Sequence, residues 1–139
     1  MAIRKLAILV PGHGGGEPGA VGQGSTEAVE TQQLVNRVYN LLAPHATIMV
    51  EKDPFENDYV ASTAWINANY LNLEDGIVVE IHKNAFNGQA TGNEVLIPGG
   101  SDATSRDMAT KVLNAMTQTT GLASRGVKER GDLYLIANC

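Results

Sequence analysis

The sequence has a single cysteine, Cys139, so no disulfide can form within the chain. Lysine and arginine total 10 residues against 15 acidic residues, which gives a formal net charge of −5 and no basic cluster of the kind that binds nucleic acid. No apolar run approaches the roughly 20 residues of a membrane-spanning helix, and the apolar stretch Leu6–Val10 is too short for a signal peptide. We therefore expect neither a nucleic-acid partner nor membrane insertion.

What remains is ordinary globular composition: 139 residues, of which 43% are hydrophobic and 18% charged, which predicts one domain with a real core. Apolar strand-like segments alternate with segments of helical periodicity. This alternation predicts an α/β fold, a three-layer sandwich whose mostly parallel central sheet is flanked by helices. We expect strands at Ala2–Val10, Thr47–Val50, Gly76–Ile81, Val95–Ile97 and in the segment DLYLIAN, and helices that begin at Ser25 or Thr26 and end near Pro44, begin at Asn57 or Asp58, and span Asp102–Thr119.

The first helix has apolar residues at helical spacing, which we expect to form its buried face. These residues are Val29, Leu34, Val35, Val38, Leu41 and Leu42.

A glycine-rich segment, PGHGGGEPGAVGQG, follows the first expected strand. So many glycines indicate sharp turns or a backbone that lies close to a ligand. A phosphate loop does not fit, because the segment lacks the Gly-Lys-Ser/Thr sequence and its glycine spacing does not match a dinucleotide site. The carboxylate of Glu17 would also repel phosphate. A metal site is the alternative that the neighbouring residues favour.

Three possible metal ligands lie at the ends of expected elements. His13 follows the first strand and His82 follows Gly76–Ile81, and the carboxyl ends of parallel strands meet at one edge of a sheet. Glu27 is in the first turn of a helix, where the helix dipole favours an ionised carboxylate. Two imidazoles and a carboxylate suit zinc with a fourth position open. Taken alone, each of these residues also fits an ordinary structural role in a loop or at the start of a helix. Glu30 is an alternative to Glu27 as the carboxylate ligand.

Three segments together resemble the zinc-dependent N-acetylmuramoyl-L-alanine amidases of type 3, especially the catalytic domains of phage endolysins. They are ILVPGHGGGEPGAVGQGSTE, VVEIHKNAFNGQATGNEVLI and GLASRGVKERGDLYLIAN, and the likeness runs from about Ile3 to Cys139. The resemblance implies that His13, Glu27 and His82 bind one Zn²⁺ and that no other cofactor is needed. It also implies hydrolysis of the amide between N-acetylmuramic acid and L-alanine in peptidoglycan.

The resemblance has departures that bear on catalysis. Pro11 follows Val10 directly, where many members have an aspartate before the Pro-Gly-His. Members also carry a second, catalytic glutamate on a strand beyond a segment like DLYLIANC. We therefore expect 1–139 to be an amidase catalytic domain that is shortened at its C-terminus and lacks that last strand and its general base.

Glu80 stands where members commonly have serine. It shares a strand face with His82, so it is placed either to hold the free ring nitrogen of His82 or simply to end a strand. It is also the internal stand-in for the missing general base. Asn84, two residues beyond His82, is placed to hydrogen-bond substrate or to satisfy a turn.

Two other functions remain open. The chain is alternatively an inactive, zinc-holding module that binds peptidoglycan. A zinc carboxypeptidase of related fold is disfavoured, because His13 is followed at the third position by Gly16 and not by glutamate. From the family we expect synthesis in a host cytoplasm and action on the cell wall, either after holin-type release or from a virion.

Overall fold

The computed structural model describes residues 5–56, 58–70, 76–83 and 91–139. The chain folds as two compact units, Met1–Ala85 and Phe86–Cys139. All three predicted metal ligands belong to the first unit. No helix in the described part of the chain is long and apolar enough to cross a membrane.

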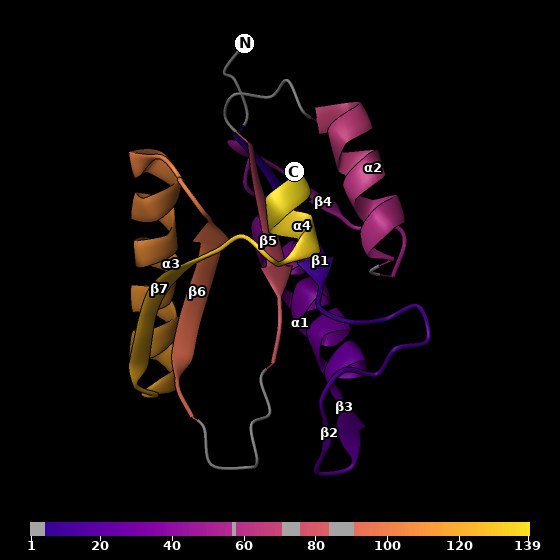
Figure 1. Ribbon diagram of the computed structural model, residues 1–139, viewed down its shortest axis with the longest axis vertical. Coiled ribbons are helices and arrows are strands. Elements are labelled where there is room, and N and C mark those ends of the chain that lie inside the picture. Colours follow the sequence, from indigo (N-terminus) through magenta and orange to yellow (C-terminus); the bar gives the residue numbers. More distant parts are fainter. Residues whose placement is uncertain (1–4, 57, 71–75, 84–90) are drawn as a thin grey trace. The chain divides into compact units, whose positions relative to one another are not determined.

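The first unit is built on a three-stranded parallel sheet in the order β4-β1-β5 (Figure 1). The central strand β1 (Lys5–Pro11) is buried after its first residue, as its continuous apolar run predicts for a sheet covered on both faces. It pairs in parallel with β4 (Ile48–Lys52) and β5 (Gly76–Ile81). The predicted α/β class, with a mostly parallel sheet flanked by helices, is confirmed.

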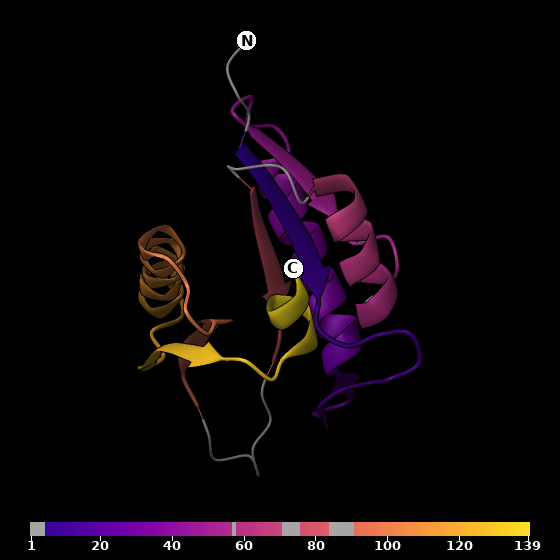
Figure 2. The same cartoon turned by 45° about the horizontal axis from the view of Figure 1, so that its top comes forward.

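Two helices flank this sheet. One face packs against α1 (Glu27–Leu42), and Leu9, Val35 and Val50 form the centre of that core. The strand order places β4 and β5 on opposite sides of β1, so right-handed crossovers put α1 and α2 (Tyr59–Tyr70) on opposite faces (Figure 2).

Side-chain caps fix where these helices begin. The Thr26 hydroxyl accepts a hydrogen bond from the backbone N–H of Val29 at 3.3 Å, which makes Thr26 the N-cap of α1. At the start of α2, the Asp58 carboxylate accepts from the N–H groups of Val60 and Ala61, both at 3.1 Å. The alternative cap, Asn57, lies outside the described residues.

The expected apolar face of α1 is partly wrong. Val29, Leu34 and Leu41 are exposed, whereas the buried residues of the helix are Glu27, Thr31 and Val35. The buried stripe is therefore rotated toward two polar residues in the first turns. The reason is that those residues bond to the glycine-rich segment, whose short strands β2 (Val21–Gly22) and β3 (Ser25–Thr26) form an antiparallel pair.

The second unit contains a parallel pair, β6 (Asn93–Pro98) with β7 (Ser124–Arg130), and the helix α3 (Ala103–Thr120). Asp102 caps the start of α3, and Gly121 ends it in the left-handed conformation at φ 69°.

One sequence expectation fails in this unit, and one strand has no counterpart in the sequence analysis. The segment DLYLIAN does not form a strand but contains a short helix, α4 (Tyr134–Asn138), which buries Leu135. Strand β7 was not predicted, because its sequence SRGVKER is highly charged and lacks the apolar alternation by which a strand is recognised.

Candidate metal centre

The two histidines lie at the carboxyl edge of the parallel sheet. Pro11, at the end of β1, pairs with Ile81 at the end of β5, and His13 and His82 follow these two residues. The backbone N–H of Gly12 donates to the carbonyl of Ile81 at 2.6 Å, which extends the strand pairing to the loop. The ring centroids are 5.1 Å apart with an interplanar angle of 87°.

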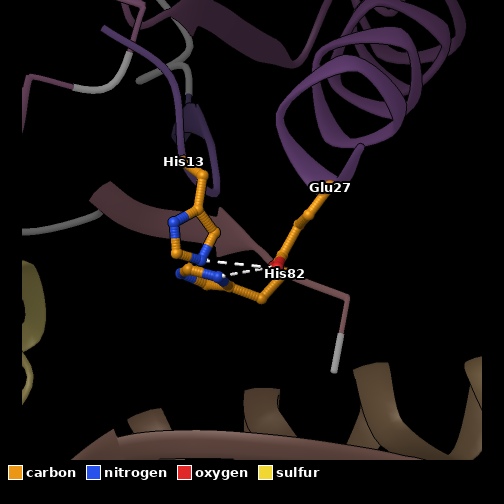
Figure 3. A group of neighbouring side chains, drawn as sticks. All are labelled: His13, Glu27 and His82. Carbon is orange, nitrogen blue, oxygen red and sulfur yellow. Dashed lines mark hydrogen bonds and ion pairs between the residues drawn. The ribbon is translucent and has the colours of Figure 1, made fainter. Parts of the chain in front are cut away.

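Both imidazoles contact the carboxylate of Glu27, which enters from the first turn of α1 (Figure 3). Glu27 Oε1 lies 3.0 Å from His82 Nδ1, and Oε2 lies 3.4 Å from His13 Nε2. One ligand atom from each residue lies within 4.8 Å of the others. Residues 55 positions apart in sequence are thus brought to one point, as the hypothesis of a shared ion requires.

The backbone holds the Glu27 carboxylate in this position. The N–H of Lys83 donates to Oε1 at 2.7 Å and that of Ala20 donates to Oε2 at 3.1 Å. Burial raises the pKa of Glu27, but these hydrogen bonds and the two histidines outweigh it and lower the pKa below its usual value. The carboxylate is therefore kept ionised, which metal coordination requires.

Two glycines leave the space that the site needs. A Cβ on Gly12 would lie 2.5 Å from His82 Nδ1, and a Cβ on Gly19 would lie 2.5 Å from His13 Cδ2 and 2.8 Å from Glu27 Oε2. Gly19 also has a positive φ of 65°, as does His13 itself at 62°. Part of the glycine-rich segment is therefore explained by the close approach of backbone to the clustered side chains.

Each histidine has a second carboxylate on its other ring nitrogen. His82 Nε2 lies 3.2 Å from Glu80 Oε1, and His13 Nδ1 lies 3.4 Å from Glu17 Oε2. Glu80 raises the pKa of His82, against the effect of burial, and Glu27 adds to the rise. Such outer carboxylates orient metal-binding histidines and fix the tautomer. Glu80 contacts the nitrogen that faces away from Glu27, which favours the orienting role over that of a general base.

The remaining candidates are Glu30 and Asn84. Glu30, the rival of Glu27, forms an ion pair with the Lys83 side chain and is not part of the cluster. Asn84 lies outside the described residues. Sequence reasoning missed Thr31, whose fully buried hydroxyl donates to the Gly12 carbonyl at 2.6 Å and ties α1 to the loop. The sequence does contain one indication of this role, because Thr31 follows Glu27 by about one helical turn and therefore shares its face of α1.

The cluster fits a zinc ion on its donor chemistry and its dimensions. Zinc takes imidazole nitrogen and carboxylate oxygen at about 2.0 to 2.2 Å in tetrahedral geometry, so neighbouring ligand atoms lie roughly 3.4 Å apart. Glu27 Oε1 lies 3.0 Å from His82 Nδ1, and the other oxygen, Oε2, lies 3.4 Å from His13 Nε2. With one ligand atom taken from each residue, all three lie within 4.8 Å of one another. Three protein ligands leave the fourth position that a catalytic zinc keeps open.

Comparison with known proteins identifies the class. Residues 8–139 match the Amidase_3 family, described as N-acetylmuramoyl-L-alanine amidase. The chain belongs to this family, which places it among the hydrolases that cleave amide bonds in peptidoglycan. A search of curated proteins found no match.

Solved structures share the fold. An N-acetylmuramoyl-L-alanine amidase from Clostridium difficile 630 is similar with a TM-score of 0.82 at 20% identity, over 97% of this chain and 74% of that one. The catalytic domain of the amidase CwlV from Bacillus (Paenibacillus) polymyxa var. colistinus gives 0.78 at 21% identity, over 95% and 73%. The amidase AmiC2 of Nostoc punctiforme gives 0.75 at 21% identity, over 95% and 72%.

Proposed function

We propose that the chain is a zinc-dependent amidase that cleaves the bond between N-acetylmuramic acid and the first L-alanine of the peptidoglycan stem peptide. Membership of the amidase family supports an amide as the bond that is cleaved and peptidoglycan as the polymer that contains it. The observation that carries the metal dependence is the convergence of His13, Glu27 and His82, with ligand atoms within 4.8 Å of one another. A bound zinc ion would supply Lewis-acid polarisation of the scissile carbonyl and would lower the pKa of water from about 15.7 toward 7.

The chain's own residues prepare the site for that ion. The N–H groups of Ala20 and Lys83 occupy lone pairs of the Glu27 carboxylate and hold it toward the histidines. When the proton of His82 resides on Nε2, which faces Glu80 Oε1 at 3.2 Å, Nδ1 carries a lone pair directed at the centre. The same argument applies to His13 and Glu17, so that the ring nitrogens near Glu27 are the ones that bind.

Proton transfer from water to the leaving amine requires a group that faces the reacting atoms. Glu80 does not meet this condition, because it lies beyond the ring of His82. We therefore assign Glu80 to holding the imidazole and not to the role of general base.

Product analysis tests this function. The zinc-loaded chain is incubated with purified peptidoglycan, and the soluble products are separated and identified by mass spectrometry. The proposal predicts release of whole stem peptides with a free L-alanine amino group, and no release by the His82→Ala variant. Peptides trimmed at the carboxyl end would instead show a carboxypeptidase, and binding to the wall without any product would show a non-catalytic module.

A further inference from the structure

A groove with a volume of about 390 Å³ lies beside the candidate metal centre, within the first unit of the chain. Its lining residues are Ser25, Glu30, Gln33, Leu34, Arg37 and Lys83. Lys83 joins the groove to the centre, because its backbone N–H donates to Glu27 while its side chain pairs with Glu30. Lys83 therefore lies between the groove and a predicted metal ligand, and four of the other lining residues belong to α1. We propose that it binds the stem peptide and that Arg37 recognises a free carboxylate on that peptide.

The charges in the groove support an acidic occupant. Lys83 and Glu30 neutralise one another, whereas no carboxylate of the described residues forms an ion pair with the exposed Arg37. One positive charge is thus left in the groove of a chain whose formal net charge is −5. A guanidinium binds a carboxylate through two parallel hydrogen bonds and gains less from neutral groups.

The dimensions of α1 indicate which part of the peptide Arg37 reaches. Glu27 and Arg37 are ten residues apart on the helix, which is about 15 Å at 1.5 Å per residue. Side chains on a helix lean toward its N-terminus, and because both residues are on α1 this lean largely cancels, so the spacing is roughly retained between the guanidinium and the metal centre. A distance of about 15 Å corresponds to roughly three residues of extended peptide together with a long side chain on the third.

Three neutral residues, Ser25, Gln33 and Leu34, complete the groove. Leu34 is 43% exposed and offers an apolar contact within it. Gln33 places an amide beside it that both donates and accepts hydrogen bonds, as a peptide backbone requires. An apolar side chain beside an amide suits a groove that binds a peptide. In the proposal, Arg37 is the residue that selects a peptide with a negative charge.

The inference rests on the proposed function, and its test uses two synthetic muramyl tetrapeptides. They are identical except at the third residue of the stem, which carries either a free carboxylate or its amide. Hydrolysis is measured for the wild-type protein, Arg37→Gln and Arg37→Lys. Lys5→Gln is the matched control, because Lys5 is an exposed cation at the opposite end of β1.

We expect Arg37→Gln to raise KM for the acidic peptide about tenfold, as the loss of a charge-assisted hydrogen bond implies. We expect an unchanged kcat, an unchanged KM for the amidated peptide and partial rescue by Arg37→Lys. Lys5→Gln should leave kcat and the KM for each peptide as in the wild type. Equal KM changes for both peptides, or equal effects of Arg37→Gln and Lys5→Gln, would overturn the proposal.

Calorimetric binding of the acidic peptide separates this proposal from the amidase function. Binding that Arg37→Gln weakens, without hydrolysis by the wild type, would support the groove and contradict the amidase. Hydrolysis at the muramyl amide by all variants, with the same KM for the acidic peptide, would support the amidase and contradict the groove.

Discussion

His82 and Glu80 face one another across the outer edge of the metal centre, with Nε2 of the ring 3.2 Å from Oε1 of the carboxylate. The other ring nitrogen lies 3.0 Å from Glu27. His82 is therefore held on both sides by carboxylates, and its two nitrogens have different roles. Because strand residues two apart share a face, β5 itself sets this contact.

Replacing Glu80 should weaken zinc binding without abolishing it. We expect Glu80→Leu to lower zinc affinity by about 10- to 100-fold, the usual effect of removing a partner that orients a ligand. Glu80→Gln retains an acceptor oxygen and should lose less. Affinity is measured by competition with a chromophoric chelator, and the tautomer of His82 is read from ¹⁵N chemical shifts. An unchanged tautomer and affinity in Glu80→Leu would show that Glu80 does not position the ring.

Glu17 provides a comparison for that variant. Its side chain is 67% exposed, against 10% for Glu80, and its contact with His13 is longer at 3.4 Å. Solvent screens an exposed contact more effectively. We therefore expect Glu17→Gln to lower zinc affinity less than Glu80→Leu does. If the same chelator competition showed a larger loss of zinc affinity in Glu17→Gln, Glu80 would not be the more important of the two carboxylates.

Gly12 should not tolerate a side chain. In Gly12→Ala, the new Cβ would lie 2.5 Å from both His82 Nδ1 and the Ile81 carbonyl, so the ring must leave its position. We expect loss of stoichiometric zinc. Gly22→Ala is the control, since a Cβ there meets nothing within 4 Å and the backbone has no positive φ. Elemental analysis of both variants measures the result, and full zinc occupancy in Gly12→Ala would refute this geometry.

Thr31 should contribute to stability through its buried hydroxyl. Thr31→Val preserves the shape of the side chain but leaves the Gly12 carbonyl without this donor. Such a loss lowers the free energy of unfolding by about 1 to 3 kcal/mol. Thr31→Ser keeps the hydroxyl and serves as the control. Urea denaturation followed by circular dichroism makes the comparison, and a Thr31→Val variant as stable as the wild type would contradict the assigned role.

The sequence predicts the parallel sheet and its ligand-bearing edge because the relevant information is local. Continuous apolar runs mark β1 and β5, and a histidine follows each of them. The position of Glu27 follows less directly, since it depends on how the glycine-rich segment folds back. The family resemblance favours Glu27 over Glu30, and the structure separates the two carboxylates by pairing Glu30 with the side chain of Lys83.

Other features depend on contacts that no local pattern contains. The burial of Thr31 results from a hydrogen bond to a residue 19 positions earlier. Strand β7 is stabilised by pairing with β6 and by contacts such as that of Lys128 with Glu94, so its charged sequence does not reveal it. The segment DLYLIAN has apolar residues that suit either a strand or a helix, and its short length leaves the choice to tertiary packing.

The most direct test of the central claim is the zinc content of the purified chain and of single ligand variants, measured by elemental analysis after dialysis against zinc-containing buffer. The wild type and Glu30→Gln should each hold one zinc ion per chain, whereas His13→Ala, Glu27→Ala and His82→Ala should hold none while keeping a folded circular dichroism spectrum. Unchanged zinc in folded ligand variants, or a wild type that binds no zinc, would contradict a metal centre formed by these three residues.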